Sequence, residues 1–350
     1  MNAPKVIRAY QYALAPSAIA QKPTTPRDRA KLLVLSNAAK QNEHRHFTDL
    51  PHLLPPNAVL VFNDTKVEPV RLQLKKETGG VVEFLVTGQE KNIAHGLTNR
   101  PLLPNQTLRL GRYRLTFLRH TDGESFFRVS WSEKSIWHVV EQFGVTPLPP
   151  YLKRSPLTEA KRRTEYQSMF AKHAGSAAAP TASLHFTPRL VRALEKAGIR
   201  IERVTLHVGL GTFAPLTNAQ VRSGKLHQEH YEISRAAAAR LNEAKKSGRP
   251  IIAVGTTVAR TLESAMRRGR LVPGQGSTQI FIRPGYRWQF VDGLITNFHV
   301  PQSSLLMLVA SLIGKKKLFS SYEEAQKKRY RFLSFGDGML ILPKEKAKRR

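Results

Sequence analysis

The feature that most constrains the fold of this chain is a change in its hydrophobic pattern near residue 150. Between residues 70 and 131, apolar residues alternate or run in short stretches separated by turn formers such as Gly79-Gly80. Regularly spaced short strands of this kind are typical of a small barrel or sandwich. After residue 151, helical and extended patterns alternate, which is typical of an α/β domain. The sequence therefore predicts a mixed-sheet α/β main domain with an inserted small all-β barrel domain.

The domain boundaries follow from the same pattern and from a proline-rich segment at residues 146–150. We expect a discontinuous main domain at residues 1–65 and 151–350, and the barrel domain at residues 66–150. Helices are expected at residues 188–198, 257–269 and 303–314, the first of them capped by Thr187. Strands are expected at residues 31–35, 59–62, 71–74, 81–86, 108–118 with a turn at Gly111, 126–131, 200–207, 250–254, 279–282, 288–291 and 294–300, and residues 331–335 and 339–342 are expected to end the fold.

The charge of the chain indicates a polyanionic partner. The sequence has 56 Lys and Arg residues against 25 Asp and Glu residues, which gives a formal charge of +31. A surplus of this size favours binding to a phosphate backbone through the release of counterions. A basic surface that serves only solubility is the alternative, because net charge does not distinguish a nucleic-acid-binding protein from an enzyme.

Composition also excludes several classes of protein. The chain has no cysteine, so it has no disulfide framework, cysteine nucleophile, thiolate-bound zinc or iron–sulfur cluster. Its longest apolar run, residues 305–313, is about half the roughly 18 residues that a membrane span requires. Residues 1–16 lack the apolar core of a signal peptide. We therefore expect a soluble cytoplasmic protein with no membrane contact.

Polar side chains occur where the predicted strands end. Ligands of open α/β sheets bind beyond the carboxyl ends of the strands, so these residues are candidates for a functional site. Each of them would also suit an ordinary turn or helix cap, and only the whole set favours a site. The candidates are Asn63, Asp64, Thr65, His207, Gly209, Gly211, Thr256, Thr257, Asn297 and His299.

Residues 175–186 consist almost entirely of small residues and lead into the helix predicted after Thr187. Small side chains let the backbone approach a ligand closely, and a helix start favours an anion or an electron-rich group. A flexible linker is the alternative, but a linker would not usually place a histidine and a phenylalanine against a capped helix. We therefore expect a site here, and its polar members are Ser176, Thr181, Ser183 and His185.

Two nucleotide-binding motifs are matched only in part. Residues 209–214 fit the dinucleotide-binding fingerprint, but residues 217–228 show no helical pattern that would follow it. Residues 255–257 join a strand to a helix as a P-loop does, but they lack its lysine. Neither motif predicts a nucleotide site.

His227 and Glu229 match the start of a two-histidine, one-carboxylate iron site, because they would share one face of a strand. His207 or His299 is available as the third ligand. With twelve histidines in the chain, a pair of this kind also arises by chance. We expect no metal, and an iron-dependent oxygenase is kept as an alternative that elemental analysis would test.

The motifs described so far occur in one order along the chain, and the ordered set is more specific than any one of them. They include residues 61–67, 175–187, 207–213, 227–229, 254–257, 296–299 and 330–332. As a set, they resemble the S-adenosylmethionine:tRNA ribosyltransferase-isomerases of queuosine biosynthesis, and the resemblance runs nearly end to end. It implies an α/β domain that carries a small barrel, as the pattern of the sequence also predicts.

The resemblance implies an unusual reaction. The ribosyl part of S-adenosylmethionine is transferred and isomerised onto 7-aminomethyl-7-deazaguanine in a tRNA anticodon, which gives epoxyqueuosine, adenine and methionine. A base must remove an acidic proton beside the sulfonium, and an acid must protonate the departing adenine. The expected titrating residues are His185, His207, His299, Asp64 and Glu229. The expected substrate-binding residues are Asn63, Thr65, Ser176, Thr181, Ser183, Gly209, Gly211, His227, Thr256, Thr257 and Asn297.

The expected partners are tRNA and S-adenosylmethionine, which is consumed as a co-substrate, so no cofactor is expected and the protein is expected to be a monomer. The chain departs from the family pattern at two single positions and around residues 99–101 in the middle of the barrel. Ala214 stands where an arginine is expected, and Gly224 stands where a histidine is expected. A non-catalytic basic RNA-binding protein is the alternative, and it would bind tRNA without turnover.

Overall fold

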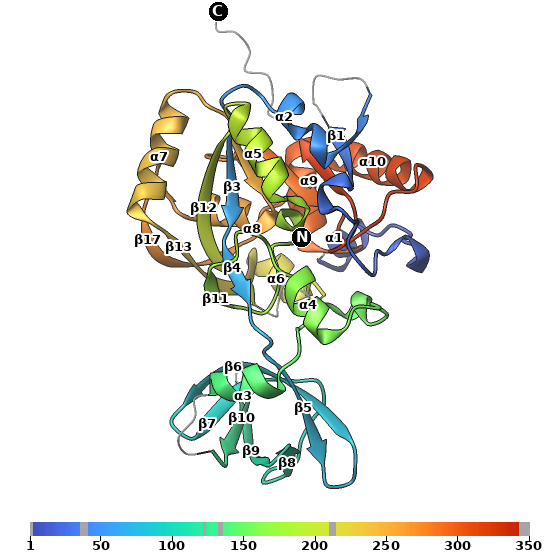
Figure 1. The fold of residues 1–350 in the computed structure, drawn as a ribbon, viewed down its shortest axis with the longest axis vertical. Helices are drawn as coiled ribbons and strands as arrows, with labels where there is room; N and C mark the ends of the chain where they lie inside the picture. Colours follow the sequence, from blue (N-terminus) through green and yellow to red (C-terminus); the bar gives the residue numbers. More distant parts are fainter. Residues whose placement is uncertain (1–2, 36–40, 122–123, 132–135, 210–214, 343–350) are drawn as a thin grey trace, which may run out of the picture. The chain divides into compact units, whose positions relative to one another are not determined.

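The computed structural model describes the chain except for six short segments. The described ranges are residues 3–35, 41–121, 124–131, 136–209 and 215–342. The chain divides into two compact units, a larger one of residues 1–66, 149–157 and 165–350 and a smaller one of residues 67–148 and 158–164. Residues 158–164, which the sequence assigns to the main domain, fall in the smaller unit. Figure 1 shows the helices and strands of each unit.

The larger unit is built on a mixed sheet that has nine strands in the described part of the chain. The strand order is β17-β13-β12-β3-β14-β18-β19-β1-β2. The neighbours β12, β3, β14 and β18 are all parallel, so their carboxyl ends lie at the same edge of the sheet. The strand bounds are β1 Lys31–Leu35, β2 Glu43–His46, β3 Val59–Asn63, β12 Arg200–His207, β13 Lys225–Ile233, β14 Ile251–Val254, β17 Gly274–Ile280, β18 Gly293–Asn297 and β19 Gly338–Ile341.

Apolar side chains cover both faces of this sheet. In β1, Leu33 and Leu35 belong to one core, and Leu32 and Val34 belong to the other. The central strands therefore read as continuous apolar runs, as strands buried on both faces do. One face packs against α7 Arg235–Lys246, α8 Thr256–Ser264, α9 Ser304–Ile313 and α10 Lys315–Lys327, and the other packs against α2 Leu50–Leu53 and α5 Pro188–Lys196 (Figure 1).

The smaller unit is a closed antiparallel barrel in the strand order β10-β7-β6-β5-β8-β9. Residues alternate between the interior and the surface, so that Leu72, Leu74, Phe84 and Phe127 are fully buried. The strand bounds are β5 Arg71–Lys76, β6 Val81–Glu90, β7 Ile93–Thr98, β8 Thr107–Leu110, β9 Tyr113–Thr121 and β10 Glu124–Val129. Two helices accompany the barrel in sequence, α3 Ile136–Phe143 and α4 Glu159–Glu165. The barrel and the mixed α/β unit confirm the predicted fold class.

Short elements complete the two units. They are α1 Ala3–Arg8, α6 Asn218–Ser223, β4 Thr65–Val67, β11 His173–Ser176, β15 Met266–Arg267, β16 Arg270–Leu271 and 3-10 turns at Pro16–Ala18, Arg27–Arg29, Phe47–Asp49, Pro150–Leu152 and Thr181–His185. Within the described residues, no helix is both long enough and apolar enough to cross a membrane.

Two local predictions are wrong. The helix expected at residues 257–269 ends at Ser264, and β15 and β16 form a hairpin after it. No strand forms at residues 288–291, because the Glu263 carboxylate, rather than a neighbouring strand, accepts the backbone N–H groups of Gln289, Phe290 and Val291. Residues 331–335, which the sequence places near the end of the fold, make an isolated bridge between Phe332 and Ile19.

The region after residue 216, which shows no clear pattern in the sequence, forms α6 and β13. Thr217 and Gln220 make a capping box at the start of α6. Gly224 ends the helix at a φ of 68°, in the left-handed region that favours glycine. The departure at Gly224 therefore has a structural reason. Ala214 lies outside the described residues.

Candidate active site

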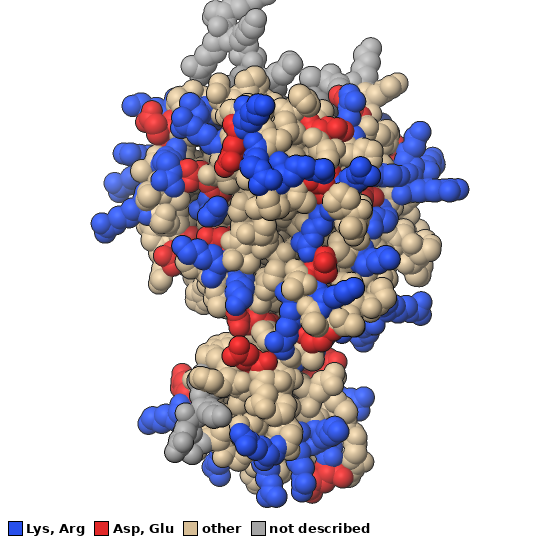
Figure 2. Space-filling view, in the orientation of Figure 1, with Lys and Arg blue, Asp and Glu red and all other residues tan. Residues whose placement is uncertain are grey.

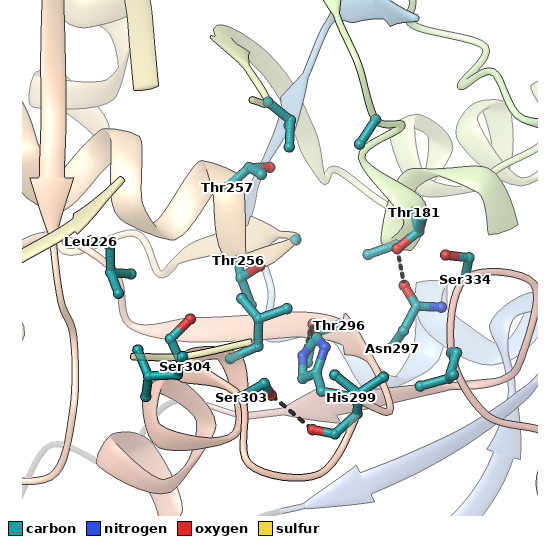
Figure 3. A pocket seen from close by; sticks show the side chains of 18 of the residues that line it. Thr181, Leu226, Thr256, Thr257, Thr296, Asn297, His299, Ser303, Ser304 and Ser334 are labelled. Atoms are coloured by element: carbon teal, nitrogen blue, oxygen red, sulfur yellow. Dashed lines mark hydrogen bonds between the residues drawn. The ribbon is translucent and has the colours of Figure 1, made fainter. Parts of the chain in front are cut away.

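A cavity of about 500 Å³ lies at the carboxyl edge of the sheet in the larger unit. It lies beyond the ends of β14 and β18 and beside the first turn of α8 (Figure 3). Apolar side chains such as Leu226 and Leu305 form part of its wall. Of the residues that the sequence indicates, Thr181, His227, Glu229, Thr256, Thr257, Asn297 and His299 line it. A mostly apolar cleft with a few convergent polar groups is the usual form of a small-molecule site.

Gly255 makes the turn from β14 into α8. Its φ is 99°, a conformation that residues with a side chain rarely adopt. The turn lets α8 begin at once after the strand, so that the hydroxyl groups of Thr256 and Thr257 reach the wall of the cavity. The strand–glycine–helix pattern at Gly255 in the sequence therefore places the first turn of α8 beside the cavity.

A hydrogen-bonded chain of three side chains runs from the cavity into the core. The Thr181 hydroxyl donates to Asn297 Oδ1 at 2.8 Å, and Asn297 Nδ2 donates to His185 Nε2 at 3.2 Å (Figure 3 shows the first of these bonds). The His185 ring stacks on Phe47 at a centroid distance of 4.1 Å. Burial, together with the charges of Arg331 and Arg27, lowers the pKa of His185 to about 3. His185 is therefore a neutral residue behind the cavity wall, and it fixes the Asn297 amide.

His299 lies two residues after β18 and lines the cavity directly (Figure 3). Its Nε2 is 3.0 Å from the Thr296 hydroxyl oxygen, and its backbone N–H donates to the Tyr322 hydroxyl at 2.9 Å. Burial lowers the pKa of His299 to about 3, so the ring is neutral at neutral pH. A neutral imidazole held in place at a cavity wall can accept a proton or a hydrogen bond from a ligand.

Glu229 forms an ion pair that the sequence does not predict. Its partner is Arg260 on α8, and the side chains of Arg260 and Glu229 are only 6% and 3% exposed. Both residues line the cavity. The signal in the sequence is an arginine four residues after Thr256, and therefore on the same face of the helix. His227, two residues before Glu229 on β13, is exposed and also lines the cavity.

A second polar cluster lies at the ends of β3 and β12. The Thr65 hydroxyl is 2.9 Å from His207 Nδ1, and the Thr205 hydroxyl donates to Asp64 Oδ1 at 2.7 Å. His173 Nε2 is 3.7 Å from Asp64 Oδ2. Burial and the nearby His173 lower the pKa of His207, while Asp64 acts in the opposite direction. Asp64, Thr65 and His207 are thus brought together, but they do not line the cavity.

Asn63 lies between the second cluster and the cavity. Its Nδ2 donates to the Leu206 carbonyl at 2.9 Å and to the Thr257 hydroxyl at 3.4 Å. Its Oδ1 accepts the backbone N–H groups of Leu206 and Thr65. The side chain therefore ties β3 to β12 and is linked to the cavity wall only through Thr257.

The segment of small residues lies against the cavity. Ala178, Ala179 and Ala182 line it together with Thr181, as expected of a backbone that approaches a ligand closely. Ser176 has a different position, because its hydroxyl donates to the Ala178 carbonyl and accepts the Val208 N–H, which braces the segment. Ser183 and Gly209 do not line the cavity. Gly211 lies outside the described residues.

The partial metal and nucleotide motifs of the sequence fall at different places in the structure. Among the residues that the structure describes, no three His, Cys, Asp or Glu side chains are grouped as a metal site. His227 and Glu229 do line one cavity, but Glu229 is paired with Arg260. The loop at residues 210–214, which carries most of the dinucleotide fingerprint, lies outside the described part of the chain.

The fold and the site define a class of protein. A mixed α/β sheet with a cavity at the carboxyl ends of its parallel strands is the organisation of a protein that binds a small ligand. The cavity also presents a neutral histidine, hydroxyl groups and an amide at its wall, and these are groups that enzymes use for proton transfer and positioning.

Comparison with known proteins gives the family. The chain matches the family of queuosine biosynthesis proteins over residues 7–341, and it belongs to that family. It is 43% identical to the S-adenosylmethionine:tRNA ribosyltransferase-isomerase of Acaryochloris marina, over 97% of this chain and 94% of that protein. It is 44% identical to the protein of the same name from Moorella thermoacetica, over 96% of this chain and 99% of that one.

A solved structure also resembles this fold. The crystal structure of S-adenosylmethionine tRNA ribosyltransferase from Thermotoga maritima aligns with a TM-score of 0.55 and 31% sequence identity. The alignment covers 95% of this chain and the whole of that one. Both units of the present chain thus fall within a known architecture.

Proposed function

We propose that this protein is an S-adenosylmethionine:tRNA ribosyltransferase-isomerase. In this reaction it transfers and isomerises the ribosyl moiety of S-adenosylmethionine onto 7-aminomethyl-7-deazaguanine in tRNA, and adenine and methionine leave as epoxyqueuosine forms. The observation that supports the proposal most directly is a cavity, lined by His299, Asn297 and Thr256, in a chain of this family. Its volume of about 500 Å³ is in the range of small-molecule sites.

His299 is our candidate for the group that accepts the proton from the carbon beside the sulfonium. The catalytic base must be unprotonated before the reaction starts, and the lowered pKa of His299 keeps its ring neutral. The same burial makes the ring a weak base, so the step depends on the acidity that the adjacent sulfonium gives to the carbon. Thr296, whose hydroxyl lies 3.0 Å from Nε2, orients the ring.

The other titrating residues take supporting roles in this proposal. His185 acts as a positioning residue, because it touches Asn297 and not the cavity. His207 and Asp64 belong to the second cluster at the ends of β3 and β12, and the contact of Asn63 with Thr257 is their link to the site.

We further propose that tRNA binds through the basic surface and that the protein acts as a monomer in the cytoplasm, where tRNA is modified. The formal charge of +31 supports electrostatic capture of a polyanion. Figure 2 shows Lys and Arg side chains spread over the visible face of the larger unit rather than gathered in one patch. Light scattering of the purified protein, with and without tRNA, would test the stoichiometry. No cofactor is required, because S-adenosylmethionine is itself consumed.

The test is the release of adenine from S-adenosylmethionine, followed by chromatography. We expect release with tRNA that carries the aminomethyl base, and none with the same tRNA lacking it. Mass spectrometry of the tRNA should show the added ribosyl-derived group. Tight binding of the substrate tRNA without adenine release would contradict the proposal and would favour a non-catalytic RNA-binding protein.

A further inference from the structure

We propose that Arg260 and Glu229 form a subsite for the amino-acid end of the sulfonium co-substrate. In this subsite Arg260 binds the α-carboxylate, and Glu229 binds the α-ammonium group. The inference rests on the proposed function, since it assumes that a sulfonium compound with an amino-acid end enters the cavity. It adds where that end of the ligand lies in the cavity and which of its charged groups faces Arg260 and which faces Glu229.

The two side chains reach the same cavity from different elements. Arg260 lies one helical turn after Thr256 on α8, so both side chains project from the same face of the helix. Glu229 projects from β13, whose register places it opposite Thr278 of β17. Arg260 and Glu229 both line the cavity and form a buried ion pair with each other.

The energetics of this pair indicate a role beyond stability. A buried ion pair seldom stabilises a fold more than apolar residues of similar size, because both charges lose their hydration. Arg260 also has an Nε group that is buried and finds no hydrogen-bond partner within the described residues. An unsatisfied buried donor destabilises the folded protein, because it has lost its hydrogen bonds to water. A ligand carboxylate that reached this side of the guanidinium would satisfy the donor.

The charge of the pair also suits such a ligand. An α-amino acid end is a zwitterion, and the pair offers one positive and one negative group at a single place in the cavity wall. The ligand carboxylate would accept hydrogen bonds from the guanidinium of Arg260 in a favourable geometry. The carboxylate of Glu229 would accept hydrogen bonds from the ligand ammonium group. When the zwitterion binds, Arg260 and Glu229 each still face an opposite charge. The amino-acid end has no net charge, so its binding adds no net charge to the cavity wall.

The test compares S-adenosylmethionine with its decarboxylated analogue, which keeps the sulfonium and the adenosyl group but lacks the α-carboxylate. For the wild-type protein we expect a KM that is about 10- to 100-fold higher with the analogue. In Arg260→Gln we expect the KM for S-adenosylmethionine to rise by a similar factor, while the KM for the analogue stays the same. The kcat for both compounds should change little.

Controls separate this role from a structural one. Arg267→Gln changes an exposed arginine on β15, outside the cavity, and should leave both KM values unchanged. If Arg260→Gln does not fold, the double variant Glu229→Gln/Arg260→Gln removes both charges together and should use the two compounds with equal KM.

Two outcomes would overturn the subsite. One is a wild-type protein that uses both compounds equally well. The other is an Arg260 variant that raises both KM values by the same factor. In either case adenine would still be released from S-adenosylmethionine, so the failure of the subsite would differ from the failure of the proposed function.

A second inference comes from the barrel and from a different observation. We propose that a row of three cations, Lys75, Arg109 and Arg114, contacts the phosphate backbone of the RNA substrate. Lys75 pairs with Arg109 between β5 and β8, and Arg109 pairs with Arg114 between β8 and β9. All three side chains are exposed. The row therefore crosses three adjacent strands on the outer face of the barrel.

Directly opposed like charges destabilise a sheet, so an arrangement of this kind has a cost in the free protein. None of the three side chains has an ion pair in the described residues. The nearby Lys76 adds a further charge, and Glu77 is the acidic residue in the hollow that Lys75, Lys76 and Arg109 share. A phosphate backbone would relieve the repulsion between the cations and release its own counterions.

The test is the salt dependence of tRNA binding. We expect the triple variant Lys75→Gln/Arg109→Gln/Arg114→Gln to bind tRNA more weakly and to lower the slope of log affinity against log salt by about 2–3. The matched control, Lys196→Gln/Lys246→Gln/Lys316→Gln, removes three exposed cations from the larger unit and should change the slope much less. Equal losses in the two triple variants would overturn the proposal. Adenine release at saturating tRNA reports the proposed function separately.

Discussion

Single residues in the cavity wall and behind it differ in how fully their hydrogen-bonding groups are used. The amides of Asn297 and Asn63 each both donate and accept, so their orientations are fixed before a ligand arrives. In contrast, Arg260 Nε and the Ser183 hydroxyl are buried and have no partner among the described residues. The satisfied amides act as scaffolding. The Nε group of Arg260 is the donor with which a bound ligand would form a new hydrogen bond.

The variant His299→Ala should abolish most of the activity while the protein remains folded. If the imidazole accepts the proton, adenine release should fall by roughly 100-fold or more. Adenine release at saturating substrate measures the loss, and circular dichroism checks the fold. His138→Ala, at an exposed histidine of α3, is the control for loss of an imidazole. Turnover that is unchanged in His299→Ala would remove His299 from the chemistry.

The variant Asn297→Ala should destabilise the larger unit. It leaves the Thr181 hydroxyl and the buried His185 Nε2 without the amide that joins them. Each buried group that loses its partner costs about 1–3 kcal/mol. Urea denaturation, read from the free energy of unfolding, measures the effect. A free energy of unfolding equal to that of the wild-type protein would show that water or another side chain replaces the amide.

Among the elements, close approach between backbones decides which substitutions the barrel accepts. Gly96 on β7 lies so close to β6 that a Cβ atom would come within 2.1 Å of the Leu85 carbonyl oxygen and 2.9 Å of a Phe84 ring carbon. No adjustment of a flexible side chain removes the contact with the carbonyl. Position 96 therefore requires glycine, because any Cβ atom would clash with the backbone of β6.

The variant Gly96→Ala should consequently destabilise the barrel by about 1–3 kcal/mol or more. Thermal unfolding followed by near-ultraviolet circular dichroism measures the change. Gly80→Ala is the matched control, because its Cβ would meet only the Lys76 side chain at 3.6 Å, an ordinary contact. Equal stability of the two variants would contradict the role assigned to the β6–β7 approach.

At the scale of the whole molecule, stability should depend on pH through its buried histidines. His185 and His299 have pKa values of about 3 in the folded protein because burial disfavours their charged forms. In the unfolded chain the pKa returns to its ordinary value of 6.5. Between these values the unfolded chain binds more protons, so the free energy of unfolding falls as the pH falls below 6.5.

Each of the two histidines should contribute a slope of about 1.4 kcal/mol per pH unit in this window. Urea denaturation between pH 7.5 and pH 5 measures it, above the range in which most carboxylates titrate. The double variant His185→Gln/His299→Gln should have a flatter profile, even if it is less stable at every pH. A slope equal to that of the wild-type protein would show that the two histidines are accessible to protons in the folded state.

Much of the architecture follows from local pattern. Thr187 with Pro188, and Ser303 before an apolar run, mark helix starts that the structure confirms. Residues 288–291 look like a strand because three of the four are apolar, but the carboxylate of Glu263, 26 positions before Gln289, accepts the backbone N–H groups of residues 289–291. No local pattern contains such a contact, because it depends on how distant segments pack.

The sequence by itself determined the family resemblance, the two kinds of local pattern and the set of polar residues at the strand ends, since each depends on residue type and spacing. Only the tertiary structure separated that set into a cavity lined by His299 and Asn297 and a second cluster around His207 and Asp64. It also brought Arg260 to Glu229. The physical reason is that strand order and helix packing, which involve residues far apart in the chain, decide which side chains share a wall.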